Sequence, residues 1–160
     1  MPLKKRSAQL SPPFVFFVDR CLGKGVVPDA LKGVLLEGET VEIHDNHYPP
    51  DTADIDWLTE VGAKGWVVLS QDQNITRNPL EQRALQAANV AFIGLASANA
   101  TGSDKARTLV TALDGVRRAL RRFGLPMIAT VTQSGEVVVK WTDGGRLKKP
   151  RRIAPKKGRS

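Results

Sequence analysis

Aspartates stand where strands of this chain are predicted to end and where one helix is predicted to begin. Asp19 directly follows the first apolar run, and Asp72 follows a later one by a short step. Asp54 and Asp56 open the segment that leads into that later run. Converging carboxylates repel one another unless a cation neutralises them, and hard oxygen ligands favour Mg²⁺ or Mn²⁺. Acids in such positions could hold a cation that promotes phosphodiester cleavage by water.

The same pattern has an ordinary structural explanation. Aspartate is a frequent turn former and helix cap, and it is common after a strand for that reason alone. On patterning alone, a structural role is the more frequent outcome for an acid at such a place. Both interpretations therefore stay open at this level.

The elements that would position these acids alternate between strand and helix patterns. Strands are predicted at residues 14–18, 41–44, 66–69 and 90–95, followed by a hairpin of 127–132 and 136–141. Helices are predicted at 28–36, at 52–61 with Thr52 as cap, at 79–88, and after the cap Ser103. This order predicts an α/β fold with a central, mainly parallel sheet and right-handed crossovers. Binding sites in such sheets lie beyond the carboxyl ends of the strands.

Length and charge divide the chain into one domain and a basic end. The 160 residues, 41% of them hydrophobic, suit a single core. Residues 146–160 carry eight Lys and Arg and no acid, which equals the whole net charge of +8. We expect an N-terminal extension at 1–13, the domain at 14–132, a hairpin strand at 133–145 and a disordered basic tail at 146–160. Such a tail suits a polyanion, because phosphate contacts release counterions.

Cysteine content and hydropathy bear on the compartment. The single cysteine, Cys21, excludes an internal disulfide and favours a reducing environment. The longest uninterrupted apolar run, Phe14–Val18, is too short to cross a bilayer, and no small-residue cleavage site follows it. We expect a cytoplasmic protein with no membrane partner.

Four segments resemble the PIN-like domain of VapC-type toxins, and more narrowly its compact branch. They are Phe16–Gly23, His44–Tyr48, Asp54–Leu58 and Gly65–Asp72. The similarity in order and spacing covers roughly residues 14–132, and the fragment around Asp72 is its most specific part. The resemblance implies a three-layer PIN-like fold and a metal-dependent endoribonuclease, commonly the toxin of a toxin–antitoxin pair.

The resemblance also implies roles for individual residues. The catalytic, metal-binding acids would be Asp19, Asp54 and Asp72. The wider set of metal ligands adds Asp56 as a rival of Asp54, Asn74 where many relatives carry an acid, and Asp45. Asp45 would replace an acid that larger PIN domains carry on a helix, for which this chain has no clear counterpart. The protein would then bind one Mg²⁺ or Mn²⁺ ion, or two.

Basic and histidine side chains near these acids, and arginines on the polar side of the longest predicted helix, are candidates for binding RNA. They are Arg20, His44, His47, Arg77, Arg117 and Arg121. Each has an ordinary alternative: an exposed turn for the histidines, salt bridges to the strand-end acids for Arg20 and Arg77, and a solvated helix face for the other two arginines.

The leading hypothesis is an RNA-cleaving enzyme restrained by an antitoxin protein, with homodimer formation as a further expectation. A non-catalytic nucleic-acid-binding module that has lost part of its metal site is the alternative, favoured by the neutral Asn74 and the missing helical acid. A phosphorylated receiver-type domain ranks last, because the sequence offers neither a clear phosphoacceptor Asp nor a strand-end Lys.

Overall fold

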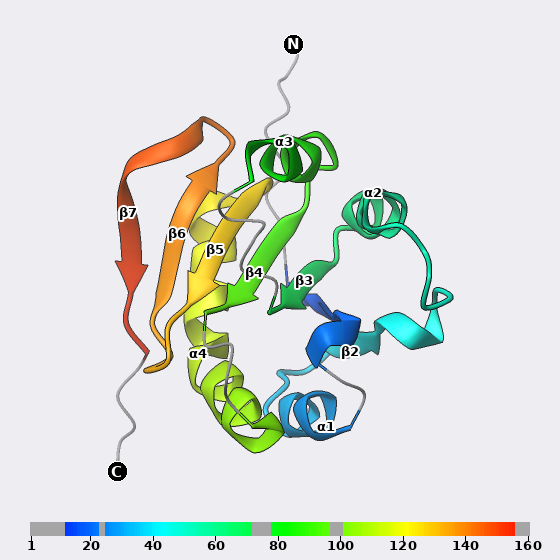
Figure 1. Ribbon diagram of the computed structural model, residues 1–160. Helices are drawn as coiled ribbons and strands as arrows, with labels where there is room; N and C mark the ends of the chain where they lie inside the picture. The colour runs from blue at the N-terminus through cyan, green and yellow to red at the C-terminus, as the bar shows by residue number, and fades with distance from the viewer. Residues whose placement is uncertain (1–11, 23–24, 72–77, 97–100, 156–160) are drawn as a thin grey trace.

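A computed structural model describes residues 12–22, 25–71, 78–96 and 101–155, which form helices around a seven-stranded sheet (Figure 1). The strands are β1 (Val15–Val18), β2 (Thr40–Ile43), β3 (Val67–Ser70), β4 (Ala91–Leu95), β5 (Met127–Val131), β6 (Val137–Thr142) and β7 (Gly145–Ile153). The helices are α1 (Val26–Lys32), α2 (Asp54–Lys64), α3 (Pro79–Ala87) and α4 (Gly102–Phe123), with short 3-10 turns η1 (Arg20–Leu22) and η2 (His44–Asn46).

The sheet order is β2-β1-β3-β4-β5-β6-β7. The first five strands pair in parallel, and β6 and β7 add an antiparallel end. This confirms the predicted α/β class and its mainly parallel sheet. The chain leaves β1 toward β2 and returns on the other side of β1 to form β3. The carboxyl ends of β1 and β3 therefore make the topological switch point, where ligands bind in open α/β sheets.

Helices cover both faces of the sheet, because successive side chains of each strand point to opposite faces. Phe16 and Val18 of β1 belong to the core that α1 and α4 cover, whereas Phe17 belongs to the core beneath α2 and α3. The result is the three-layer arrangement that was predicted. None of the helices in the described part of the chain is both long and apolar enough to cross a membrane.

The position of α4 departs from the expected winding. The steps from β3 to β4 and from β4 to β5 run in the same direction across the sheet, yet α3 and α4 lie on opposite faces. Two such crossovers have opposite hands, so the expectation that all crossovers are right-handed is wrong. The helix packs against α1 and against β4, β5 and β6, and Figure 1 shows it behind the sheet. The seven residues of α1 leave most of that face uncovered, and α4 buries it.

The predicted helices exist, but two of their caps differ. Thr52 does not cap α2: the residue before the helix is Ala53, and the Thr52 hydroxyl donates to the Pro49 carbonyl oxygen (2.8 Å). Thr101 caps α4 by accepting from the Asp104 amide (3.1 Å), so Ser103 lies inside the helix. Both errors are shifts of one or two residues at a helix start, and they differ in kind: Thr101 and Ser103 have similar capping ability, whereas Ala53 offers no capping side chain and α2 begins without one.

The largest correction concerns the basic end of the chain. Residues 146–153 are not disordered, because β7 pairs antiparallel with β6. Leu147 and Ile153 pack against the core on the α4 side. An edge strand needs few buried positions and tolerates Lys, Arg and Pro on its open side. The fold therefore extends past the predicted boundary at residue 145, and residues 156–160 lie outside the described part.

Candidate active site

Asp19 is fixed at the switch point by both neighbouring strands. Its backbone amide donates to the Leu69 carbonyl oxygen (2.9 Å), which extends the β1–β3 pairing by one residue. Its Oδ1 accepts from the Arg20 amide (2.7 Å), and its Oδ2 accepts from the hydroxyl of Ser70 (2.8 Å). Ser70 ends β3 and is fully buried. The carboxylate is thus held in one orientation at the edge where a site was predicted.

Asp54 reaches the same region from the first residue of α2. Its Oδ1 accepts from the indole nitrogen of Trp57 (3.1 Å). Trp57 is buried and packs against Phe17 and His44, with ring centroids 5.3 and 5.2 Å apart. The orientation of Asp54 therefore depends on the aromatic core beneath it.

The negative charge of Asp54 acts on the Asp19 carboxylate. Burial raises the pKa of Asp19 above its ordinary value, and the negative charge of Asp54 raises it further. The hydrogen bonds from Ser70 and from the Arg20 amide oppose this rise, as does His44. Of the two rival acids at the start of α2, Asp54 is the one whose charge acts on Asp19 in this way. Asp56 lies exposed in the same helical turn.

His44 and Asp45 lie beside these acids in η2. His44 is only 1% exposed, so the expectation of an exposed loop is wrong for this residue. Its Nδ1 is buried, lies 3.5 Å from Asp45 Oδ1 and has no hydrogen-bond partner in the described part of the chain. Asp45 accepts from the Arg20 guanidinium (3.1 Å), which is the salt bridge considered as the ordinary alternative for Arg20.

The other candidates for RNA binding separate by burial. His47 is exposed, and its Nε2 lies 2.8 Å from Glu42 Oε1. Arg121 is exposed near the end of α4, whereas Arg117 is only 6% exposed. The Arg117 guanidinium donates to both carboxylate oxygens of Glu39 (2.8 and 3.0 Å) and to the Val34 carbonyl oxygen. The expectation that Arg117 is available to RNA is therefore wrong.

Three residues of this region were not predicted as part of the site. The first is Ser70, described above. The second is Cys21, whose thiol lies 3.4 Å from the Ser70 hydroxyl and accepts from the Gln71 amide. Burial, followed by the charge of Asp19, raises the pKa of Cys21, so the thiol stays protonated at neutral pH. Lys105, in the first turns of α4, donates to the Gln71 side chain (2.7 Å). A serine that ends a fully apolar strand is the one sequence signal that could have pointed here.

A divalent cation at this edge of the sheet requires several oxygen ligands. Asp19 and Asp54 supply carboxylate oxygens, which suit Mg²⁺ or Mn²⁺. Among the described residues, no group of three or more His, Cys, Asp or Glu side chains is placed to hold a metal ion. The predicted site residues Asp72, Asn74 and Arg77 lie outside the described residues, directly after Gln71. The residues that the structure describes therefore do not by themselves form a complete metal site.

Comparison with known proteins identifies the domain. Residues 14–97 match the family described as PIN like domain, and this match covers more than half of the chain. It runs from β1 through β4 and includes Asp19, Asp45, Asp54 and Asp72. No curated protein and no solved structure matches the chain. The fold, the switch-point acids and this match agree, and the chain belongs to the PIN like domain family.

Proposed function

We propose that this protein is a divalent-metal-dependent endoribonuclease. The observation that carries the proposal is the convergence of Asp19 and Asp54 at the switch point, where the charge of Asp54 raises the pKa of Asp19. A carboxylate whose charge is disfavoured by burial and by a neighbouring carboxylate is stabilised by a nearby cation. PIN-like domains are commonly nucleases, and the family assignment supports the same chemistry.

In this proposal Asp19, Asp54 and Asp72 hold Mg²⁺ or Mn²⁺. The cation would supply Lewis acidity for water activation and for the leaving oxygen of the phosphodiester. The hydroxyl of Ser70 and the indole of Trp57 set the orientations of Asp19 and Asp54, so neither carboxylate has to reorganise on binding. Asp56, Asp45 and Asn74 remain proposed as further ligands.

The surroundings of these acids suit a phosphate-bearing strand. Arg20 is 47% exposed in its side chain and lies next to Asp19, so its guanidinium can take a phosphate oxygen while it keeps Asp45 in place. His47 is exposed on the same flank. His44 is buried against Trp57 and acts in this proposal by orienting its neighbours, without touching RNA. Arg77 is kept as a proposed phosphate ligand.

The biological setting is part of the proposal. The similarity of the four segments to VapC-type toxins supports a cytoplasmic toxin whose activity an antitoxin protein restrains, and a homodimer as its assembly. The test is co-expression with the product of any small reading frame beside the gene. A stable complex in which RNA cleavage is suppressed supports this setting, and an unrestrained enzyme contradicts it.

A second candidate is a non-catalytic PIN-like module that binds nucleic acid. Two observations favour it: the described residues contain no three-acid metal cluster, and Asp45 is engaged by Arg20. Such a module would bind RNA with or without Mn²⁺ and leave it intact.

Cleavage of single-stranded RNA separates the two candidates. We expect Mn²⁺-dependent cleavage that a chelator stops and that Asp19→Asn or Asp72→Asn abolishes while RNA binding persists. Asp143→Asn, an exposed acid in the turn between β6 and β7, is the matched control and should cleave normally. Intact RNA after long incubation with Mn²⁺ at saturating protein would favour the non-catalytic module. Unchanged cleavage by both site variants would mean that the activity lies elsewhere.

A further inference from the structure

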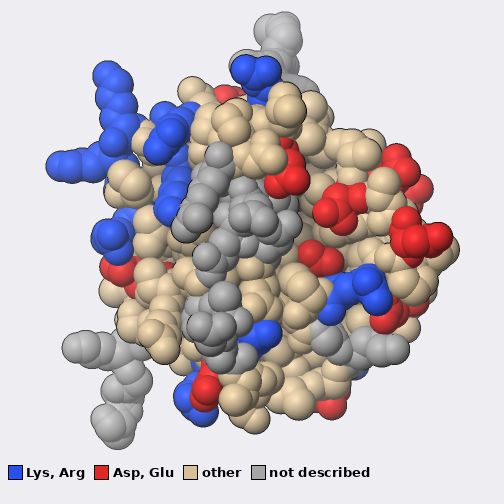
Figure 2. Space-filling model, in the orientation of Figure 1, with Lys and Arg blue, Asp and Glu red and all other residues tan. Residues whose placement is uncertain are grey.

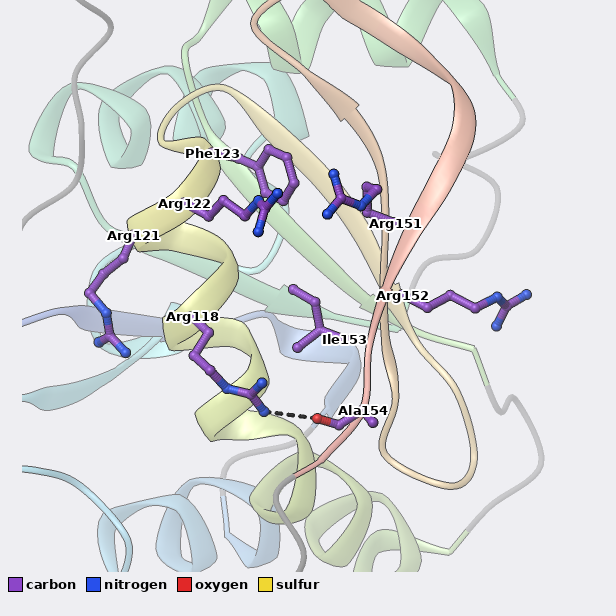
Figure 3. A pocket seen from close by; sticks show the side chains of 8 residues that line it. All are labelled: Arg118, Arg121, Arg122, Phe123, Arg151, Arg152, Ile153 and Ala154. Atoms are coloured by element: carbon purple, nitrogen blue, oxygen red, sulfur yellow. Dashed lines mark hydrogen bonds between the residues drawn. The ribbon is translucent and has the colours of Figure 1, made fainter.

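A groove rich in arginine lies between the C-terminal half of α4 and the end of β7 (Figure 3). Its volume is about 530 Å³. The lining consists of Arg118, Arg121, Arg122 and Phe123 from α4, and Arg151, Arg152, Ile153 and Ala154 from the β7 end. None of these lining residues is acidic. The groove is thus a concave surface lined by five arginines, and the guanidinium groups of two of them, Arg122 and Arg151, lie near its one aromatic ring.

Two kinds of contact hold the walls of the groove in place. Arg118 donates to the Ala154 carbonyl oxygen (2.8 Å) and to Asp114 (3.0 Å), which ties the helix to the end of the strand. Arg122 and Arg151 lie over the ring of Phe123, with 5.6 and 5.9 Å between each guanidinium carbon and the ring centroid. Figure 3 shows these two arginines approaching the ring from different elements. The groove is preformed in the folded protein.

Three of the guanidinium groups have no acidic partner among the residues that the structure describes. Arg118 is paired with Asp114 and Arg152 with Glu136. Within the described ranges, no ion pair joins Arg121, Arg122 or Arg151 to a carboxylate. Like charges gathered on one groove disfavour one another, and an anion relieves that repulsion. The planar guanidinium fork suits the tetrahedral oxygens of phosphate.

The positive surface continues along β7. Arg146, Lys148 and Lys149 are exposed on the same strand, and Figure 2 shows the basic side chains gathered on the side of the molecule that carries β6 and β7. Basic residues on an edge strand also discourage pairing with another chain. That explanation applies to β7 alone, because Arg121 and Arg122 belong to helix α4 and do not lie on a strand edge.

We propose that this groove binds the phosphate backbone of a single nucleic-acid strand. The site is separate from the acids at the switch point, since β7 stands five places from β1 in the sheet. At about 4.8 Å per strand spacing this separation is roughly 24 Å, so only a strand of several nucleotides can reach both. The choice of nucleic acid over another polyanion rests on the proposed nuclease function.

The distribution of charge supports a binding groove that is separate from the acidic site. Asp51, Asp54, Asp56 and Glu60 are exposed around the start of α2, and Figure 2 shows acidic side chains on the side opposite β7. Without a cation, this acidic side repels RNA. In this proposal the groove, on the opposite side, supplies the affinity for RNA. It does so without reading base sequence, because phosphate contacts carry no sequence information directly.

Binding of a fluorescent 20-nucleotide oligouridylate, measured by anisotropy with a chelator present, tests the proposal. Arg121→Gln and Arg151→Gln should each weaken binding about fivefold, and each should lower the slope of log affinity against log salt by about 0.7. The matched control is Arg107→Gln, an exposed arginine paired with Asp104 near the other end of α4. It should change affinity less than twofold. Equal losses of affinity in all three variants would overturn the proposed groove site and indicate diffuse electrostatic attraction. Melting temperatures verify that each variant is folded.

Competition identifies the ligand class. Unlabelled oligouridylate should displace the probe at far lower concentration than inorganic phosphate, or polyglutamate of equal charge. Equal competition by polyglutamate would overturn the proposal in favour of an acidic peptide, and displacement by phosphate alone at low millimolar concentration would reduce the groove to a small-anion site. Oligouridylate binding at the groove without any RNA cleavage would contradict the nuclease proposal and leave the groove proposal valid.

Discussion

At Asp19 the protein accepts an unfavourable charge in a partly buried position. The carboxylate is flanked by β1 and β3, its pKa is raised by burial and by Asp54, and two hydrogen bonds offset only part of that cost. A residue selected for stability alone would be neutral here. The cost is consistent with an acid kept for binding a cation.

Asp19→Asn should stabilise the metal-free protein at pH 7. Because the folded pKa is raised, the folded state keeps its proton to higher pH than the unfolded state, and stability falls as pH rises through that range. Asparagine carries no such penalty, so its advantage should be present at pH 7 and shrink toward pH 4. Melting curves at the two pH values measure this, with Asp143→Asn as control. An advantage of equal size at both pH values would contradict the assigned cause.

Arg117 shows the limit of helix periodicity at the residue scale. Arg117 and Arg121 are four residues apart and should share a face, yet the first is buried and the second exposed. The difference arises because Glu39, which is distant in the sequence, packs against α4 and forms a buried ion pair with Arg117. No pattern local to the helix contains that information.

The Glu39–Arg117 pair gives a second prediction. Arg117→Met leaves a buried carboxylate without its partner and should lower the free energy of unfolding by about 3–5 kcal/mol. Adding Glu39→Leu should recover most of the loss, since it removes the unpaired charge. Denaturant titrations of the single and double variants test this, with exposed Arg121→Met as control. A double variant as unstable as Arg117→Met would refute the interpretation.

At the scale of elements, the predicted strands and helices were found within a few residues of their expected positions. The exceptions have identifiable reasons. Pattern-based prediction needs buried positions at regular spacing, and β7 offers only Leu147 and Ile153 toward the core among many cations. The face chosen by α4 was also beyond prediction, because it depends on what α1 leaves uncovered.

Truncation tests the corrected role of β7. Ending the chain after Gly145 removes the strand paired with β6 and the packing of Leu147 and Ile153 against the core, so the melting temperature should fall by several degrees. Ending it after Pro155 keeps all of β7 and should leave the melting temperature unchanged. If both truncations melt like the full chain, the strand contributes no stability and the original expectation of a tail would be restored.

At the scale of the whole molecule, the sheet brings together acids that are far apart in sequence. Asp19 and Asp54 lie in the same region because β1 ends at the switch point and α2 begins there. The apolar runs and the acids that follow them predicted a site at this edge of the sheet, and which of these acids bind a ligand stays a prediction. The partners that orient the acids, Ser70 and Trp57, depend on contacts across the core and had to be seen in the structure.

The central claim is that the switch-point acids bind a divalent cation, and melting with and without Mn²⁺ measures it most directly. A ligand that binds only the folded state stabilises it by about 2.7 kcal/mol at one hundred times its dissociation constant. We predict that saturating Mn²⁺ raises the melting temperature of wild type and of Asp143→Asn alike, and leaves that of Asp19→Asn unchanged. An equal rise in all three proteins, or none in wild type, would contradict the account.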